Sequence, residues 1–176
     1  GQFLAMDTGV ASGKIEGLET TEPAFGLPAV WISSAARGRA ESLGYTVVDA
    51  SSVVATHLTE TIRARAPDLL TRVEVQSLLE NLKSMNEGRA AKLVDEVVDK
   101  VLKAGEIQKV LQNLLRERVS VRDLETILEA LGDTGGRTKD AGVLTEFVRH
   151  ALGRSICLAV QEKGRIHCVT LDPKLE

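Results

Sequence analysis

The chain has 176 residues, of which 43% are hydrophobic and 27% are charged, a composition typical of folded globular proteins and unlike that of disordered ones. Its net charge is −3, with acidic and basic residues mixed along the chain, so we expect no basic face and no nucleic-acid partner. No apolar run approaches the roughly 20 residues that span a membrane, and two cysteines without a secretory signal favour a reducing, cytosolic environment.

The first 50 residues are expected to form a small α/β subdomain. Residues 2–6 have the pattern of a strand and lead into a glycine-rich loop, and the apolar run at 29–33 is consistent with a buried strand. A short helix that ends at Gly44 and a strand over residues 45–50 follow. Because the sequence begins with Gly-Gln, directly in the first strand, we expect it to be part of a longer protein.

A helix over residues 53–66 is expected next. Ser51 or Ser52 is its expected N-cap, because a serine oxygen can accept a hydrogen bond from a free amide of the first turn. Pro67 is expected to end the helix, since proline lacks the amide hydrogen that continues it.

From Pro67 onward the sequence predicts a mainly helical bundle. Apolar residues recur at helical spacing, and no further proline occurs before Pro173. Thr71 and Glu74 have the spacing of a capping box, and Ser120 is expected to cap a later helix. The five expected helices cover residues 71–83, 90–102, 106–117, 120–132 and 143–160.

The last part of the chain is expected to add a strand. After Gly164, residues 165–171 have the pattern of one more strand. The predicted fold class is therefore α+β, with a small α/β subdomain, a mainly helical bundle and the first strand of a further α/β subdomain at the C-terminus.

The residues alone indicate no site for catalysis, a cofactor or a metal. Residues 9–14, Gly-Val-Ala-Ser-Gly-Lys, have three residues between the glycines where a phosphate-binding loop has four, and Ile15 follows in place of Ser or Thr. His150, Cys157 and His167 match no common zinc spacing. Cys157 continues the apolar side of a helix, so we expect an inert, buried thiol. By elimination a binding or scaffolding role is favoured, and the rival hypothesis is a cysteine-dependent enzyme with Cys157 as nucleophile.

Residues 21–32, Thr-Glu-Pro-Ala-Phe-Gly-Leu-Pro-Ala-Val-Trp-Ile, gather aromatic residues in a chain that is only 3% aromatic. The stretch is either an entry into the core or a surface on which a partner docks. Docking is possible because the prolines stiffen the backbone, which lowers the entropy lost on binding. Trp31 is expected in the core, whereas both alternatives stay open for Phe25. His57 is expected to be half-buried on a helix.

Six stretches, taken in chain order, resemble the cytoplasmic part of the type III secretion export-gate family, FHIPEP. They are PAFGLPAVWI, GYTVVDASSVVATHLTE, LLTRVEVQSLLENLK, IQKVLQNLLRERVSVRDLETILEAL, ALGRSI and VTLDPKLE. The resemblance covers nearly the whole chain. ALGRSI and LDPKLE are more similar to flagellar members than to those of virulence injection systems, which are the alternative.

The resemblance implies a docking platform for flagellar protein export at the cytoplasmic face of the bacterial inner membrane. The implied partners are chaperone–cargo complexes, the export ATPase complex and other export-gate subunits. The implied assembly of the full protein is a homo-oligomeric ring, typically of nine subunits. No enzyme activity and no cofactor are implied.

The family has an N-terminal membrane part and four cytoplasmic subdomains, and the resemblance divides this chain among them. Residues 1–50 resemble the α/β second subdomain, and residues 51–67 resemble a linking helix that closes a largely absent first one. Residues 68–150 resemble the helical third subdomain, and residues 151–176 resemble the start of the α/β fourth.

In flagellar members a hydrophobic dimple between the first and second subdomains receives the chaperones. The positions associated with it read Glu22, Phe25 and Thr56 in this sequence. The family often has Asp where this chain has Glu22, so the carboxylate here reaches one methylene further. An apolar ring beside an acid and a hydroxyl would offer a partner both an anchor and orienting polar groups.

Overall fold

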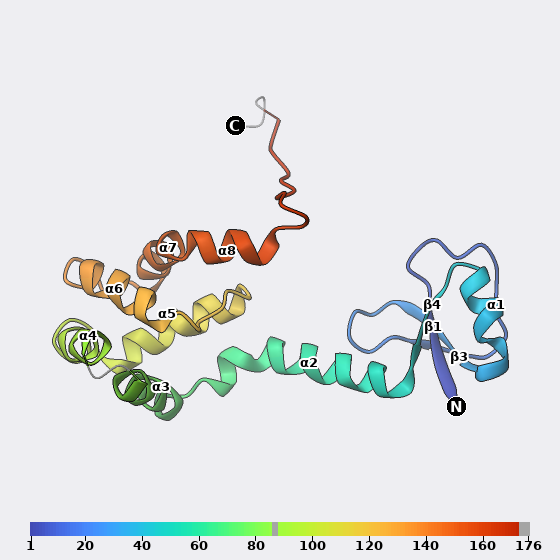
Figure 1. The fold of residues 1–176 in the computed structure, drawn as a ribbon, viewed down its shortest axis with the longest axis horizontal. Coiled ribbons are helices and arrows are strands. Elements are labelled where there is room, and N and C mark those ends of the chain that lie inside the picture. The colour runs from blue at the N-terminus through green and yellow to red at the C-terminus, as the bar shows by residue number, and fades with distance from the viewer. Residues whose placement is uncertain (86–87, 173–176) are drawn as a thin grey trace. The chain divides into compact units, whose positions relative to one another are not determined.

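A computed structural model describes residues 1–85 and 88–172 of the chain (Figure 1). The chain divides into two compact units, Gly1–Arg65 and Ala66–Glu176, each with hydrophobic clusters of its own. A sheet lies in the first unit and a helical bundle in the second, so the predicted α+β class is confirmed. No helix in the described ranges is both long and apolar enough to cross a membrane.

A four-stranded antiparallel sheet forms the centre of the first unit. Its strands are β1 (Gln2–Met6), β2 (Leu18–Thr21), β3 (Pro28–Ser33) and β4 (Thr46–Asp49), in the spatial order β2-β3-β1-β4. The sequence predicted three of these strands and missed β2, whose Leu-Glu-Thr-Thr sequence contains no apolar run. Backbone pairing to β3, from Leu18 opposite Trp31 to Thr21 opposite Pro28, holds β2 at the sheet edge.

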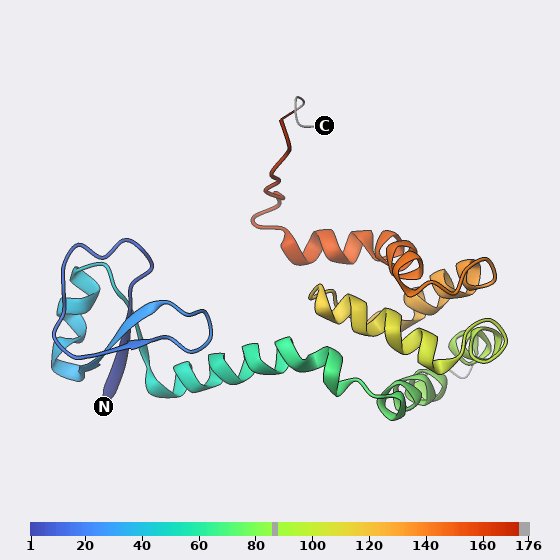
Figure 2. The same ribbon diagram turned by 180° about the vertical axis from the view of Figure 1, so that it is seen from behind.

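Alternate residues of the strands pack into two small cores, one on each face of the sheet. One core consists of Ala5, Ile15, Ile32 and Ala40. The other consists of Leu4, Ala29 and Val53. The connection from β3 to β4 contains the 3-10 turn η1 (Ser34–Ala36) and the helix α1 (Arg37–Ser42), and Figure 2 shows α1 beside the strands.

Helix α2 (Ala50–Leu69) begins earlier and ends later than the sequence predicted. Asp49, rather than a serine, caps it: the carboxylate accepts the Ser52 N–H at 2.9 Å and the Ser51 and Ser52 hydroxyls at 2.7 and 2.6 Å. These hydrogen bonds, that of the Ser52 hydroxyl foremost, hold the pKa of Asp49 well below its usual range. Pro67 lies inside the helix, which loses one amide donor there but continues to Leu69.

The second unit is a bundle of short helices around one large core (Figure 1). Its helices are α3 (Arg72–Met85), α4 (Arg89–Val97), α5 (Ala104–Arg116), α6 (Leu124–Gly135), α7 (Ala141–Ala151) and α8 (Gly153–Val160). α5 packs against α3 and α7, and α6 packs against α4 and α7. The largest fully buried side chains of this unit include Leu102, Ile107, Leu111, Leu114, Ile127, Leu128, Leu131 and Leu144. The predicted helical bundle is therefore confirmed.

Two expected helices are interrupted. The helix predicted over 90–102 ends at Val97, because Asp99 adopts a left-handed φ of 65° and the chain turns back on itself. The helix predicted over 143–160 is instead two helices, α7 and α8, which meet at Leu152. Apolar periodicity continues across both breaks, so the pattern alone did not reveal them.

The structure confirms some of the predicted helix caps and not others. The Thr71 hydroxyl donates to the Glu74 carboxylate, so the two residues of the predicted capping box do contact each other. Asp123, rather than Ser120, caps α6 by accepting the Thr126 N–H at 3.2 Å. Ser, Asp and Asn are comparable N-caps, so sequence spacing could not rank Ser120 against Asp123.

Residues 165–171 form no strand. Glu162 and Arg165 exchange two backbone hydrogen bonds of 2.8 and 2.9 Å at a turn, and residues 166–171 take part in no β-bridge with the described part of the chain. A strand is stabilised by hydrogen bonds to a neighbour, so a suitable residue pattern alone does not produce one. The strand expected to begin a further α/β subdomain is therefore not formed in this structure.

Candidate functional site

A cavity of about 270 Å³ in the first unit brings together the three residues singled out from the sequence. Glu22 and Phe25 come from the loop between β2 and β3, and Thr56 comes from α2. The other lining residues are Met6, Leu27, Val48, Ser52 and Val53. Two segments that are distant in the sequence therefore form one site.

The floor of the cavity is apolar, and the sheet determines its position. Met6 lies at the end of β1 and Val48 lies on β4, and both pack against the core that contains Leu4. Val53 and Thr56 are three residues apart on α2, which places them on the same side of the helix. The sequence analysis missed these floor residues, although strand alternation puts Leu4 and Met6 on one face and could have identified Met6.

Phe25 lies at the rim of the cavity with 62% of its surface exposed. It is therefore not a core residue, which decides between the two alternatives that the sequence left open. A large exposed apolar side chain beside an apolar cavity is typical of interaction sites. Trp31 is half-buried against the sheet core, whereas His57 is exposed, so the expectation of a half-buried His57 was wrong.

The loop that carries Phe25 is folded around Glu22. The Glu22 N–H donates to the Leu27 carbonyl at 2.8 Å, and the Glu22 carbonyl accepts the Gly26 N–H at 3.0 Å. The two carboxylate oxygens accept the N–H groups of Ala24 and Phe25 at 2.9 and 2.7 Å. Gly26 has a φ of 72°, a conformation that glycine adopts without steric cost. Glu22 itself is only 2% exposed.

Residues 9–14 do not form a phosphate cradle. Oδ1 of Asp7 accepts the N–H groups of Gly9 and Ala11 at 2.8 and 3.4 Å, so a carboxylate of the protein occupies these loop amides. The Tyr45 hydroxyl donates to the Gly13 carbonyl at 2.9 Å and ties the loop to the unit. The loop borders a second cavity of about 620 Å³. These contacts support the reading of the stretch as a turn.

The two cysteines form no disulfide. Both Cys157 and Cys168 are exposed, so the expectation of a buried Cys157 was wrong. α8 packs mainly against α7, which leaves most of the surface of α8 open to solvent. Within residues 1–85 and 88–172, no three His, Cys, Asp or Glu side chains are grouped as a metal site requires.

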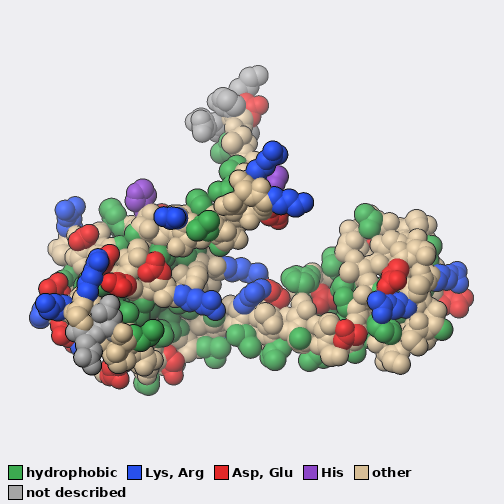
Figure 3. All heavy atoms as spheres, viewed as in Figure 1, with side chains coloured by type: hydrophobic (Ala, Val, Ile, Leu, Met, Phe, Trp, Pro, Cys, Tyr) green, Lys and Arg blue, Asp and Glu red, His purple; other side chains and the backbone are tan. Residues whose placement is uncertain are grey.

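An apolar stripe runs along the exposed side of α2. Val54, Leu58 and Ile62 are spaced four residues apart, and each is more than half exposed. Figure 3 shows apolar side chains following the helix. Residues spaced in this way share one helix face. This face is exposed, whereas Val53 of the same helix is buried against the sheet.

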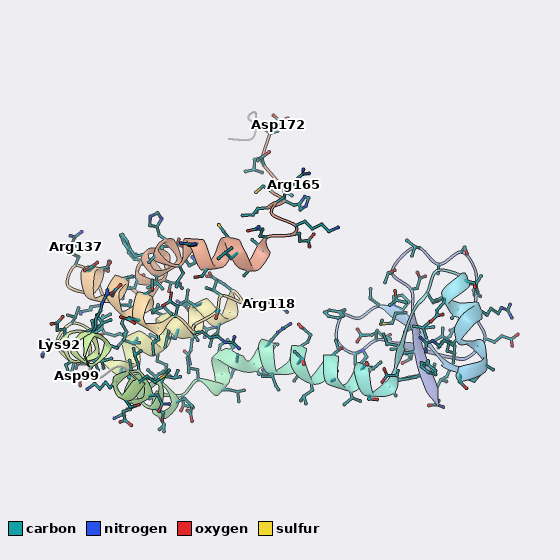
Figure 4. The ribbon with its side chains drawn as sticks, in the orientation of Figure 1. Lys92, Asp99, Arg118, Arg137, Arg165 and Asp172 are labelled. Atoms are coloured by element: carbon teal, nitrogen blue, oxygen red, sulfur yellow. The ribbon has the colours of Figure 1, made fainter. Side chains whose placement is uncertain are left out.

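The helical unit presents a mixture of charges and one exposed aromatic residue. Arg89 on α4 forms ion pairs with Glu125 and Glu129 on α6, and these carboxylates, Glu129 foremost, raise the pKa of Arg89. Figure 4 shows Lys92 on α4 and Arg137 at the end of α6. Phe147, which is 50% exposed, borders a cavity of about 410 Å³ between α6 and α7.

Comparison with known sequences places the whole chain in one group of proteins. The FHIPEP family matches residues 1–176. Flagellar biosynthesis protein FlhA of Bacillus subtilis is 49% identical over 175 residues, which are 99% of this chain and 25% of that protein. Flagellar biosynthesis protein FlhA of Escherichia coli is 43% identical over 177 residues, which are 100% of this chain and 25% of that protein. The chain thus spans about a quarter of the length of these relatives.

Solved structures share the fold. The Chlamydia pneumoniae CdsV protein is 26% identical and superposes with a TM-score of 0.75 over 98% of this chain and 49% of that chain. In the complex of Chlamydia pneumoniae CdsV and CdsO, the values are 27% identity and a TM-score of 0.68 over 83% of this chain and 42% of that chain. The nonameric EPEC SctV-C, at 24% identity, has a TM-score of 0.67 over 92% of this chain and 48% of that chain.

Proposed function

Because this chain belongs to the FHIPEP family, we propose that it is part of the docking platform of a flagellar type III protein export gate. In this role it binds chaperone–cargo complexes for secretion and flagellum assembly. The observation that carries the proposal is the cavity around which Glu22, Phe25 and Thr56 meet. The higher identity to flagellar biosynthesis proteins favours the flagellar system, and the equivalent subunit of a virulence injection system is the alternative.

The cavity has the chemistry of a docking site for an apolar side chain. Met6, Val48 and Val53 supply an apolar floor, and the exposed ring of Phe25 extends it at the rim. Water released from these surfaces on binding supplies the main attraction. The hydroxyl of Thr56, which also lines the cavity, gives the partner a polar group to align with.

For the whole protein we propose a ring of nine subunits at the cytoplasmic face of the bacterial inner membrane. The ring contacts the export ATPase complex and other export-gate subunits. The nonameric assembly of SctV-C and the complex of CdsV with CdsO support these two parts of the proposal. The proposed function includes no catalytic step, no cofactor and no nucleic acid.

We also propose the subdomain division that the resemblance implied. It comprises residues 1–50, the linking helix at 51–67, the helical residues 68–150 and the start of a last subdomain at 151–176. The division of the structure between Arg65 and Ala66 lies close to the second of these boundaries and supports it.

Substitution of Thr56 tests the docking site without emptying any part of the core. Thr56→Val keeps the shape of the side chain and removes the hydroxyl, so affinity for a flagellar chaperone–cargo complex should fall by about 0.5–1.5 kcal/mol, the usual value of a hydrogen bond. Thr61→Val, on the same helix but outside the cavity lining, is the control and should bind as the parent does. Titration calorimetry measures both.

Equal affinity of the two threonine variants would contradict the placement of the docking site. Titration with an injection-system chaperone–cargo complex distinguishes the two export systems. Tighter binding of that complex than of the flagellar one would favour the alternative system.

A further inference from the structure

We propose that Glu22 is a positioning residue for docking: its carboxylate holds Phe25 at the rim of the cavity and makes no contact with the partner. The proposal rests on the docking function proposed above. It replaces the simpler expectation that an acid beside an exposed ring orients the partner directly.

The carboxylate of Glu22 is already engaged inside the protein. One oxygen accepts the Ala24 N–H at 2.9 Å and the other accepts the Phe25 N–H at 2.7 Å. Glu22 is 2% exposed, whereas Phe25 is 62% exposed. Although Glu22 lines the cavity, both of its carboxylate oxygens are already engaged, so the phenylalanine ring is the main surface that a partner meets here.

These two hydrogen bonds fix the backbone from which the ring of Phe25 projects. Packing contributes less to holding this residue, because 62% of the surface of Phe25 is exposed. The carboxylate instead fixes the backbone on both sides of Ala24, and hydrogen bonds to a charged acceptor are about twice as strong as neutral ones. The backbone groups of Glu22 close the same loop through Leu27 and Gly26.

A loop that is already fixed in the free protein binds its partner with higher affinity. A mobile loop would lose conformational entropy when a partner immobilises the ring, and a loop that is already held loses less. Pro23 restricts the backbone next to the same carboxylate and acts in the same direction. Glu22 thus raises affinity through Phe25, which predicts that its effect disappears when the ring is absent.

Glu22→Gln is the first test variant. The glutamine side chain has one accepting oxygen, and its NH2 group would face the second amide donor, so one of the two hydrogen bonds is lost. We expect faster hydrogen exchange at the Ala24 and Phe25 amides, measured by NMR on the free protein, with unchanged exchange in β1 as the control for the fold. We expect binding of a flagellar chaperone–cargo complex to weaken about tenfold.

The double variant separates positioning from direct contact. In a Phe25→Ala background, Glu22→Gln should change the affinity by less than about twofold, because the ring through which it acts is gone. Glu22→Asp is the conservative variant: a shorter carboxylate accepts the amides two and three residues onward at many turns, so its affinity should stay within about threefold of the parent. If Glu22→Gln does not fold, the amide exchange and the affinity of Glu22→Asp, measured with and without the ring of Phe25, replace it.

Two results would overturn the proposal. One is an equal loss of affinity for Glu22→Gln with and without the ring, or a large loss for Glu22→Asp while its Ala24 and Phe25 amides exchange as slowly as in the parent, since either means that the acid contacts the partner. The other is unchanged exchange of the Ala24 and Phe25 amides in Glu22→Gln. A parent protein that binds no chaperone–cargo complex overturns the docking function instead, while the amide exchange still decides whether Glu22 holds the loop.

Discussion

Two carboxylates fix the backbone of the two segments that line the cavity. Asp49 accepts hydrogen bonds at the start of α2, the helix that carries Thr56, and Glu22 accepts them in the loop that carries Phe25. Asp49 is the last residue of β4, and Glu22 directly follows β2 of the same sheet. The geometry of the rim therefore depends on acceptors that satisfy free amides at the ends of strands rather than on packing alone.

Asp49 gives α2 a stability that depends on pH. Its pKa in the folded protein lies below the value of about 3.9 for an unfolded chain, so its contribution is present above about pH 4 and declines as the pH falls toward the folded pKa. Asp49→Asn removes the charge, so its melting temperature should lie below that of the parent at pH 6, and the gap should narrow at pH 3. Thermal melts followed by circular dichroism measure this, and a gap that does not change with pH would contradict it.

At the scale of elements, the resemblance located the residues of the site, but their arrangement could not be read from the sequence. The sequence did not decide whether Phe25 is buried in the core or exposed at the surface, because the exposure of a side chain depends on which elements pack near it. β2 was missed since an edge strand can be held by backbone pairing alone. Cys157 was expected to be buried because helical periodicity shows which side chains share a face, not whether another element covers that face.

The exposed apolar stripe of α2 and the buried core of the sheet should differ in how much they stabilise the fold, and this difference can be measured. Leu58 on the exposed stripe is 57% exposed, whereas Leu4 in the sheet core is fully buried. Leu4→Ala should lower the free energy of unfolding by about 2–5 kcal/mol through the cavity that it leaves. Leu58→Ala should change it by less than about 0.5 kcal/mol, because the position is a surface one and alanine favours helix.

Urea unfolding of the two variants measures these free energies. Equal losses for Leu4→Ala and Leu58→Ala would mean that the stripe is covered in the folded chain. Both substitutions remove the same side-chain atoms, so burial is the main difference between them, with a smaller contribution from the preference of alanine for helix at Leu58.

At the scale of the whole molecule, the two units differ in the size of their cores. The helical unit has one continuous cluster built mainly from leucine, isoleucine and valine, whereas the sheet has a small cluster on each face. We therefore predict slower amide hydrogen exchange in α5 and α6 than in β1 and β4, because exchange in the larger core requires more extensive opening. Mass spectrometry of exchanged peptides measures this, and faster exchange in α5 and α6 would contradict it.

The central claim is that Phe25 is an anchor for docking and not part of the core, and it is tested most directly by titrating a flagellar chaperone–cargo complex against Phe25→Ala. Phe147→Ala is the matched control, since Phe147 is an exposed phenylalanine of the other unit. Phe25→Ala should weaken binding by about 1–2 kcal/mol, the loss expected at an interface hot spot, while its melting temperature stays close to that of the parent. Phe147→Ala should leave both unchanged. A loss of about 3–5 kcal/mol in stability for Phe25→Ala, with unchanged affinity of the folded fraction, would contradict the claim and assign Phe25 to the core.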